Sequence, residues 1–460
     1  MSTFVIELDD RALALAFRGR VLDAAPSVVF DGSTSEREGS HAWDSMRRFP
    51  ASTSTRHLTS VTGQENVPQG AARLLLAELR VRLEAHADVV KDKVWIATPV
   101  RVEPRGLGAV LDIAKQLSLP LQGFIDSATA TAAALQLGRA VLVVEMGLHH
   151  IAVTAVASGS QARRRRSVFS ERGGIIELYE TWLDLLSTTM VKRTRFDPLH
   201  DAATEQALFA AMPAWARSAS EKGEIAVSIP MRGDHFDVTL SRDQFLEAAQ
   251  PIYRELTRLL HELRPAGTPV AIVLPEPISK LPGLLHLLEQ FVGCELVVVP
   301  DGFAAAVASV LDLSGAEDAG PVRLLRRVPS RTLEPLLATP IREVADFQRE
   351  RVLAASHVLF NGRAYALGKE GIVVGRSPES STMTKIELPG GLAGVSRRHC
   401  TFVAAGDELV LVDHSSFGTY VNDERVSERV SVHAGDRVRI GEPGVELTLI
   451  AVGEFAGAAS

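Results

Sequence analysis

The chain has 460 residues, of which 46% are hydrophobic and 23% charged, an ordinary composition for a globular protein with roughly two to four domains. Its formal net charge of −7 excludes a global attraction to nucleic acid or anionic lipid, so any phosphate binding must come from a local patch. Cys294 and Cys400 are too few for a disulfide framework or a cysteine-rich zinc site, and they suit a reducing compartment.

The N-terminus and the most apolar window both argue against export or membrane insertion. The first residues, MSTFVIELDD, carry acidic side chains where a signal peptide would have an apolar core. The window AVLVVEMGLHHIAVTAVA is interrupted by Glu145 and two histidines, so no membrane span is expected. We therefore expect a cytoplasmic protein.

The N-terminal part of the chain alternates strand-like and helix-like segments. Residues 31–69 come before most of them and are rich in Ser, Thr, Gly and charge, which predicts a long exposed polar loop. From residue 70 onward, apolar runs such as KVWIATPV alternate with helical stretches such as RDQFLEAAQPIYRELTRLLHELRP. This alternation predicts an α/β domain over residues 1 to about 312.

The C-terminal part has a different pattern. Residues 313–351 contain prolines and clustered arginines, and we expect them to form an interdomain linker with little structure of its own. Within residues 352–460, short β-like runs such as GIVVGR and ELVLVDH are separated by glycine-rich turns. This spacing is typical of an all-β sandwich.

Four motifs in the C-terminal part occur in a fixed order: GIVVGR (371–376), VSRRHC (395–400), VDHSSFGTYVND (412–423) and HAGDRVRIG (433–441). Together they resemble the forkhead-associated (FHA) domain over roughly residues 352–451. That family has a Gly-Arg near its start, then a Ser-x-x-His, an Asn-Gly-Thr-like turn and a late Gly-Asp. The resemblance implies a β-sandwich that binds phosphothreonine peptides through loops at one end.

The same resemblance assigns roles to individual residues. Arg376 and Ser396 are expected to contact the phosphate directly, Arg397 to lie beside them, and Ser416 to reach it from the next loop. A guanidinium fork is well suited to a phosphate dianion, because it offers rigid, charge-assisted donors. A sandwich that has kept its shape and lost its ligand is the alternative.

Other residues of the motifs are expected to shape the site. By resemblance, His399 is a buried brace that fixes the loops. Phe417 stands where the family often has an asparagine that holds the peptide backbone, which leaves the peptide selectivity open. The structural residues of the turns are Gly375, Gly418, Thr419 and Asn422.

Catalytic and metal-binding interpretations of VSRRHC are weaker. A Cys-His or Ser-His nucleophile needs an orienting carboxylate and an oxyanion site. His399 and Cys400 are adjacent on a predicted strand, where successive side chains face opposite ways. A zinc site needs three or four ligands. We therefore expect no catalytic residue and no metal at this motif.

The N-terminal domain carries a second resemblance, formed by GRVLDAAPSVVF (19–30), KVWIATPVRV (93–102), DSATATAAALQLG (126–138), VLVVEMGLHHIAVTAV (141–156), GDHFDVTLSRDQF (233–245), AIVLPEPISKLPGLLHLLEQF (271–291) and VPDGFAAAVASVL (299–311). Their order is similar to that of the actin and heat-shock chaperone ATPase superfamily. The resemblance implies two α/β lobes around a nucleotide cleft.

Two phosphate loops of that superfamily are altered in this chain. The first should read Asp-x-Gly-Thr, but Asp9 and Asp10 replace its glycine and hydroxyl residue and add negative charge. The second begins at Glu145 and keeps a single glycine, Gly147. Small residues are needed there because backbone N–H groups must approach the phosphates closely.

The adenosine loop is altered as well, since Pro275, Glu276 and a second proline replace the expected Gly-Gly, and proline lacks an N–H donor. These losses indicate a pseudo-ATPase without a cofactor. Glu145 could still hold a magnesium-bound water, and His149 and His150 could bind a metal or phosphate. We favour the simpler interpretation that the two histidines are turn residues whose side chains face apart.

Two polar features have ordinary explanations. The run Arg163–Arg166 is more typical of a solvated hairpin tip than of a nucleic-acid site. The polar loop suits phosphorylation by a serine/threonine kinase, because threonines lie near Arg47 and Arg48; the FHA-like domain could then bind them in cis or in a second copy. The threonines concerned are Thr34, Thr53, Thr55, Thr59 and Thr62.

The sequence as a whole predicts a cytoplasmic adaptor that performs no chemistry. It would bind a phosphothreonine-containing protein in a serine/threonine kinase pathway, and neither nucleic acid nor membrane. One alternative is an active ATP-dependent chaperone-like or filament-like protein regulated by its FHA domain. Another is a structural subunit in which both domains are vestigial.

Overall fold

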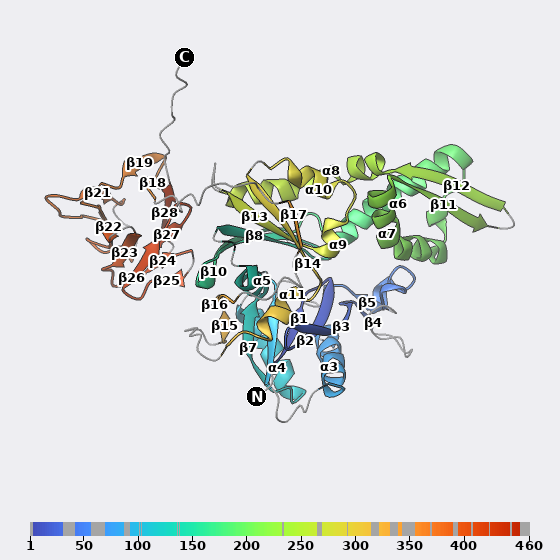
Figure 1. Cartoon of the computed structure of the whole chain (residues 1–460), viewed down its shortest axis with the longest axis horizontal. Helices are drawn as coiled ribbons and strands as arrows, with labels where there is room; N and C mark the ends of the chain where they lie inside the picture. Colours follow the sequence, from blue (N-terminus) through green and yellow to red (C-terminus); the bar gives the residue numbers. More distant parts are fainter. Residues whose placement is uncertain are drawn as a thin grey trace, which may run out of the picture. The chain divides into compact units, whose positions relative to one another are not determined.

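The computed structural model describes residues 3–30, 42–56, 70–86, 93–100, 102, 104–135, 137, 139–231, 234–264, 269–291, 293–313, 322–331, 339–342, 355–368, 370–389, 394–405, 408–422, 424–441 and 444–450. The chain forms two compact units, Met1–Val344 and Ala345–Ser460 (Figure 1).

The first unit contains a six-stranded sheet in the order β15-β7-β6-β1-β2-β3. Its first three strands form an antiparallel meander, and β6, β7 and β15 add to it in parallel. The strands are β1 (Thr3–Leu8), β2 (Ala12–Phe17), β3 (Arg20–Pro26), β6 (Lys93–Thr98), β7 (Leu121–Asp126) and β15 (Leu324–Leu325).

A seven-stranded sheet in the order β16-β10-β9-β8-β13-β14-β17 repeats this arrangement. Again an antiparallel meander of three strands, here β8 to β10, is continued by two parallel strands, β13 and β14. The strands are β8 (Ala140–Met146), β9 (Ile151–Ala157), β10 (Gln161–Ser170), β13 (Val270–Pro275), β14 (Cys294–Val299), β16 (Arg327–Pro329) and β17 (Thr339–Arg342).

Alternating side chains of each sheet enter separate cores. On β1, Phe4 and Ile6 pack on one face with helices α3 (Gly70–Glu84) and α4 (Pro104–Gln116), and Val5 faces the other way. That second face meets α5 (Ser127–Leu135) and α11 (Phe303–Ala308), which lie between the two sheets (Figure 1). Both helices are alanine-rich, and small side chains let them pack closely in this central layer.

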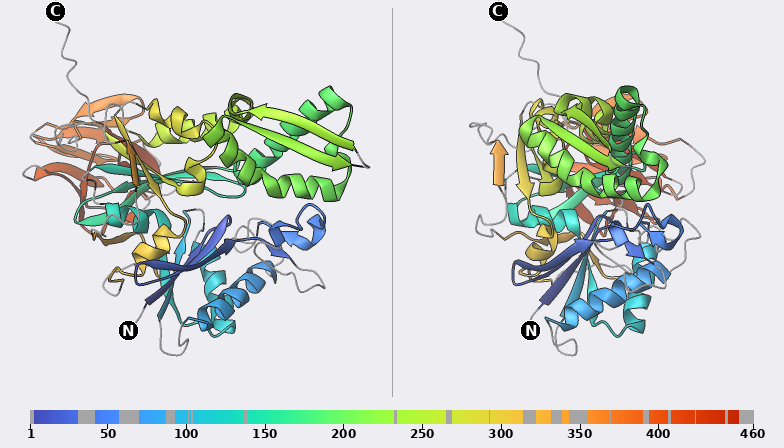
Figure 2. Two further views of the ribbon diagram at one scale, coloured as in Figure 1. Left: turned by 45° about the vertical axis from the view of Figure 1, so that its right-hand side comes forward. Right: turned by 90° about the vertical axis from the view of Figure 1, so that its right-hand side faces the viewer.

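Helix α8 packs on the second sheet against β9 and β10, and two further long helices and a hairpin pack on α8 and on one another. They are α6 (Ile175–Thr194), α7 (Ala202–Lys222), α8 (Arg242–Leu263), β11 (Glu224–Met231) and β12 (Asp234–Ser241), with the short η2 (Pro198–His200), α9 (Glu276–Ser279) and α10 (Leu284–Glu289). Figure 2 shows the hairpin alongside α6 and α7 in both views. A capping box between Ser241 and Gln244 begins α8, as the pattern Ser-x-x-Gln favours.

The expected polar loop at 31–69 has more structure than predicted. Residues 42–56 belong to the first unit: Ala42 and Met46 are buried in its core, and Arg47 pairs with Glu180 at 2.6 Å. The segment also contains η1 (Pro50–Ser52) and β5 (Thr53–Ser54), which pairs with β4 (Val29–Phe30). Residues 31–41 and 57–69 lie outside the described part of the chain, and with them Thr34, Thr59 and Thr62.

The expected linker at 313–351 needs a correction too, because it supplies three strands to the first unit. β15 pairs with β7, β16 with β10, and β17 with β14. Leu324, Leu325 and Val328 are buried, so apolar burial and edge pairing hold the segment in place. The first unit accordingly extends well beyond residue 312.

The second unit is a β-sandwich, as its turn spacing predicts. One sheet has the order β19-β18-β28-β27-β24-β25 and the other β21-β20-β22-β23-β26. Their inner faces share one core that includes Ile372, Phe402 and Leu447. The strands are β18 (His357–Phe360), β19 (Arg363–Ala366), β20 (Ile372–Gly375), β21 (Thr384–Glu387), β22 (Cys400–Ala405), β23 (Glu408–Asp413), β24 (Thr419–Val421), β25 (Glu424–Arg425), β26 (Arg429–Val432), β27 (Arg437–Ile440) and β28 (Val445–Ile450).

Among the residues described, no helix has the length and apolar character needed to cross a membrane.

Candidate functional site

Three loops meet at one end of the sandwich because of the strand register. Val374, next to the end of β20, pairs with Cys400 at the start of β22, and Cys400 pairs with Asp413 at the end of β23. The segments that follow Gly375, precede Cys400 and follow Asp413 must therefore lie at the same end of this sheet. They carry Arg376, Ser396 with Arg397, and Ser416, so the fold brings together the four residues expected to bind phosphate.

Gly375 allows the first two of these loops to touch. The N–H of Arg376 donates to Ser396 O at 3.1 Å, and the N–H of Ser377 donates to Arg397 O at 3.2 Å. A Cβ atom on Gly375 would lie 3.0 Å or less from the carbonyl oxygens of both Ser396 and Arg397. Only glycine fits this approach, which is why the motif needs a Gly directly before its arginine.

His399 connects the second loop to the third. Its side chain is fully buried, its Nδ1 accepts the N–H of Ser396 at 3.1 Å, and its Nε2 lies 3.2 Å from Gly418 O. Nδ1 can accept only in a neutral ring, so Nε2 carries the hydrogen and donates to Gly418. Burial lowers the pKa of His399, which favours that neutral form.

The third loop is held by its own serines and by Asp413. Asp413 Oδ1 accepts the N–H of Ser415 at 3.0 Å and the hydroxyl of Thr419 at 2.7 Å. Ser415 Oγ accepts the N–H of Gly418 at 2.7 Å, and the N–H of Ser416 donates to Ser396 Oγ at 3.3 Å. These hydrogen bonds of Ser415, Ser416, Gly418 and Thr419 fix the loop beside Ser396.

Asn422 stabilises the sandwich next to this turn. Its Nδ2 donates to Asp436 Oδ1 at 2.9 Å, and its Oδ1 accepts the N–H of Arg437 at 3.1 Å. The residue adopts φ 50°, a left-handed conformation that asparagine tolerates better than most residues. Asn422 is therefore structural and lies behind the exposed loops.

The exposed groups at this end can recognise an anion. Arg376, Arg397 and Arg398 are exposed, and Ser416 is exposed on the adjoining loop. The hydroxyl of Ser396 accepts one hydrogen bond and can still donate its own hydrogen. Guanidinium and hydroxyl donors that converge on rigid loops are suited to a phosphate group.

In the first unit, the two loops that sequence analysis compared with phosphate loops contact each other through Asp10. Asp10 Oδ1 accepts the N–H of Leu148 at 2.9 Å, and Asp10 Oδ2 lies 3.4 Å from His150 Nδ1. His150 lies in the turn between β8 and β9, as expected, and it is only 3% exposed because it is the buried partner of Asp10. His149 does face elsewhere, and its Nε2 lies 2.8 Å from Thr55 Oγ1.

Gly147 lies within this contact. A Cβ atom on Gly147 would lie 2.4 Å both from Asp10 Oδ1 and from His150 Cε1. The one glycine that remains in the second loop is thus packed against side chains of the protein itself.

A cavity of about 50 Å³ lies beside these loops, lined by Glu7, Asp9 and Glu145, by the Arg11–Asp301 pair and by Pro275. Burial raises the pKa of Glu7 to about 7. Burial, with the charge of Asp10, raises the pKa of Asp9 to about 7. Burial, with the charges of Asp126 and Asp9, raises the pKa of Glu145 to about 8.

This cavity is lined by three of the residues that sequence analysis placed at the nucleotide loops, namely Asp9, Glu145 and Pro275. Glu276 is paired with Lys280 at 2.5 Å, one turn along the chain. In the described part of the chain, no cluster of His, Cys, Asp or Glu is arranged to hold a metal ion.

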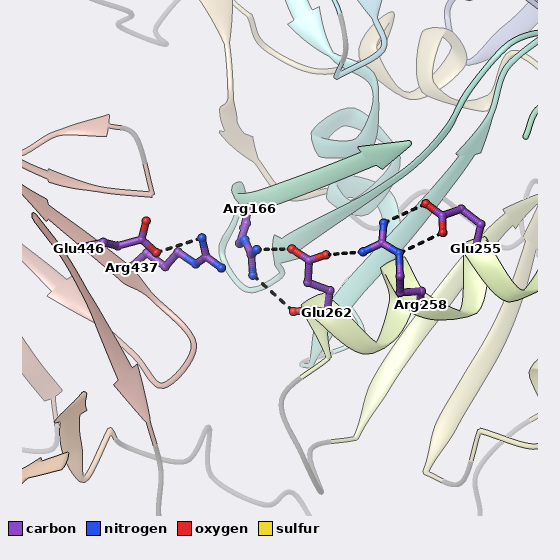
Figure 3. A network of polar contacts seen from close by, with 6 residues as sticks. All are labelled: Arg166, Glu255, Arg258, Glu262, Arg437 and Glu446. Atoms are coloured by element: carbon purple, nitrogen blue, oxygen red, sulfur yellow. Dashed lines mark hydrogen bonds and ion pairs between the residues drawn. The ribbon is translucent and has the colours of Figure 1, made fainter. Parts of the chain in front are cut away.

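The arginine run needs a correction. Residues 163–166 lie inside β10 instead of at a hairpin tip. Arg164 pairs with Asp126 at 3.0 Å, and Arg166 pairs with Glu262 at 2.5 Å. In Figure 3, Glu262 also contacts Arg258, and Arg258 in turn contacts Glu255. The figure also draws the Arg437–Glu446 pair, which belongs to the second unit. Internal carboxylates thus neutralise part of the run.

The two cysteines are buried free thiols, and burial raises the pKa of Cys400 above its usual range. This suits structural residues better than a nucleophile, because the thiolate is the reactive form.

Comparison with known proteins agrees with the geometry of the second unit. Residues 372–441 match the family model described as FHA domain. The curated proteins contain no match to the chain. The matched residues span the three loops described above, from β20 to the end of β27. The sandwich of the second unit therefore contains an FHA domain.

Proposed function

We propose that this protein is a phosphothreonine-dependent adaptor or scaffold, in which a pseudo-ATPase domain is joined to a phosphopeptide-reading FHA domain. FHA domains bind phosphothreonine-containing proteins, and the match at residues 372–441 supports an interaction module of that kind. The observation that carries the proposal is the convergence of Arg376, Ser396, Arg397 and Ser416 on loops tied together by His399.

The site would recognise phosphate by charge-assisted hydrogen bonds. Arg376 supplies a planar guanidinium fork at the end of β20, and Arg397 adds a second cation from the neighbouring loop. The hydroxyls of Ser396 and Ser416 complete a set of donors around the phosphate oxygens. An unphosphorylated threonine offers no charge to these groups, so binding would depend on phosphorylation by a serine/threonine kinase.

One feature supports a nucleotide-free first unit, whose repeated sheet order is the one expected of two similar α/β lobes. Asp10 accepts a hydrogen bond from the Leu148 N–H, a donor of the kind that a phosphate would need, and its carboxylate places negative charge there. We accordingly propose a scaffold without catalytic residues or cofactor, acting in the cytoplasm.

The proposal is tested by calorimetric titration of the whole chain with a degenerate phosphothreonine peptide library and, separately, with ATP and magnesium. We expect peptide binding that vanishes in Arg376→Ala and with unphosphorylated peptides, and no heat from ATP. Arg20→Ala, which removes an exposed arginine of the first unit, is the matched control and should bind normally.

The other outcomes separate the alternatives. ATP binding with turnover would indicate an active chaperone-like or filament-like protein regulated by its FHA domain. Failure to bind either ligand would indicate a structural subunit, and the adaptor function would be rejected.

A further inference from the structure

Phe417 is unusually exposed for an aromatic side chain. Its exposed fraction of 67% is the largest among the exposed large hydrophobic side chains of the described residues. It lies on the third loop of the phosphate-binding end, directly after Ser416. Large apolar side chains that stay in water at a binding site commonly contact a partner.

The loop fixes the backbone on both sides of Phe417. The N–H of Ser415 is bonded to Asp413, and the N–H of Gly418 is bonded to Ser415 Oγ at 2.7 Å. The carbonyl of Gly418 faces His399 Nε2 on the inner side. The backbone on both sides of Phe417 is therefore anchored before any ligand arrives, so little conformational entropy is lost when the ring is covered.

The surroundings of the ring are cationic and polar. A Cβ atom on Gly418 would lie 2.8 Å from Arg425 Nε, which shows that the Arg425 side chain packs against this bare glycine. Arg376 and Arg397 are exposed on the two neighbouring loops. A single exposed apolar side chain, on a loop whose neighbouring loops carry arginines, does not form the broad apolar patch of a stable protein dimer. Its surroundings fit one side chain of an anionic peptide instead.

We infer that Phe417 is a specificity-determining residue, which selects phosphothreonine peptides carrying an apolar side chain close to the phosphorylated residue. The inference rests on the proposed function, because the phosphate must dock for the flanking side chain to reach the ring. The ring has no hydrogen-bond donor or acceptor for a peptide backbone, so its contribution comes from covering apolar surface. Covering a large part of the apolar surface of the ring should strengthen peptide binding about tenfold.

The test uses the full chain and phosphothreonine peptides in which each flanking position is in turn leucine or asparagine. We expect the wild-type protein to prefer leucine about tenfold at one or more positions. Phe417→Ala should abolish that preference and leave the affinity for the all-polar phosphopeptide within about twofold, since it removes no phosphate contact and adds no group that could bond to the peptide backbone. Phe417→Leu should keep most of the preference.

Phe169→Ala is the matched control, because Phe169 is 53% exposed on the first unit and should not affect the preference. Binding without any apolar preference, or a preference that persists in Phe417→Ala, would overturn the specificity role and leave phosphothreonine binding in place. If the wild-type protein binds no phosphopeptide, or if Arg376→Ala binds as well as wild type, the proposed function fails and the inference fails with it.

Discussion

The buried ring of His399 and the backbone of Ser396 share one hydrogen bond, in which Nδ1 accepts the Ser396 N–H at 3.1 Å. A proton on Nδ1 would turn this acceptor into a donor that faces another donor. The shape of the phosphate-binding loops therefore depends on a neutral histidine.

This dependence predicts that the second unit loses stability in mild acid. Burial lowers the pKa of His399 below the 6.5 of an unfolded chain, so the unfolded state binds more protons as the pH falls from about 6.5 to the folded pKa. The free energy of unfolding should fall across that window by at most about 1.4 kcal/mol per pH unit for this group.

Urea unfolding of the second unit between pH 5 and pH 7.5 measures this slope. His399→Gln should be less stable at neutral pH and show a weaker slope. A smaller slope should remain, because burial and the charge of Arg398 also lower the pKa of His414. An unchanged slope in the variant would show that His399 is not the responsible group.

Replacing Gly375 with alanine should damage the site through its backbone. The added Cβ would collide with Arg397 O and force the Ser396–Arg397 segment away from β20. We expect a loss of about 1–3 kcal/mol in the free energy of unfolding, together with weaker phosphopeptide binding. Gly368→Ala is the control, since nothing lies within 4 Å of its added Cβ. Equal effects of the two substitutions would contradict this explanation.

Asp10 and Asp9 are neighbours in sequence with opposite expected responses to substitution. Burial alone would raise the pKa of Asp10, but the charge of His150 and the Leu148 N–H lower it, so Asp10 is a buried anion. Asp10→Asn removes the negative charge that pairs with His150. The free energy of unfolding, measured by thermal or urea unfolding, should fall by about 3 kcal/mol. Asp9→Asn should be neutral or stabilising, because the raised pKa of Asp9 already favours its uncharged form. Comparable losses in both variants would argue against the Asp10–His150 pair.

Glu145 should make the first unit less stable at alkaline pH. Its pKa is raised to about 8, chiefly by burial, whereas an unfolded glutamate is ionised above about 4.5. Its contribution to stability therefore falls as the pH rises from about 4.5 to about 8. The free energy of unfolding of Glu145→Gln should rise by about 3 kcal/mol relative to wild type between pH 5.5 and pH 8.5. Melting temperatures at the two pH values test this, and an equal difference at both would rule it out.

The motifs of the second unit could be predicted because they are local. Gly375, Ser396 and His399 occur in short patterns with characteristic residues, and the strand register then places those patterns at one end of the sheet. The exposure of Phe417 could not be predicted in the same way, since it depends on how the anchored loop directs the ring.

The missed features of the first unit are non-local or very short. Asp10 and Leu148 are separated by 138 positions, and no sequence pattern indicates their contact. β15 has two residues and β16 has three, too few for a periodic pattern, and their pairing depends on strands far back in the chain. The environment of the run Arg163–Arg166 could not be predicted, because carboxylates from α8 and from the end of β7 pair with it only in the folded state.

The adjacency of β15 and β16 limits how the two halves of the first unit can move. Leu325 is paired in one sheet and Arg327 in the other, so a single residue, Arg326, joins them. Its carbonyl accepts the N–H of Arg164 at 3.0 Å. At this edge the two sheets cannot slide apart without breaking strand pairing. The motion of one sheet relative to the other that remains possible here is rotation about the backbone bonds near Arg326.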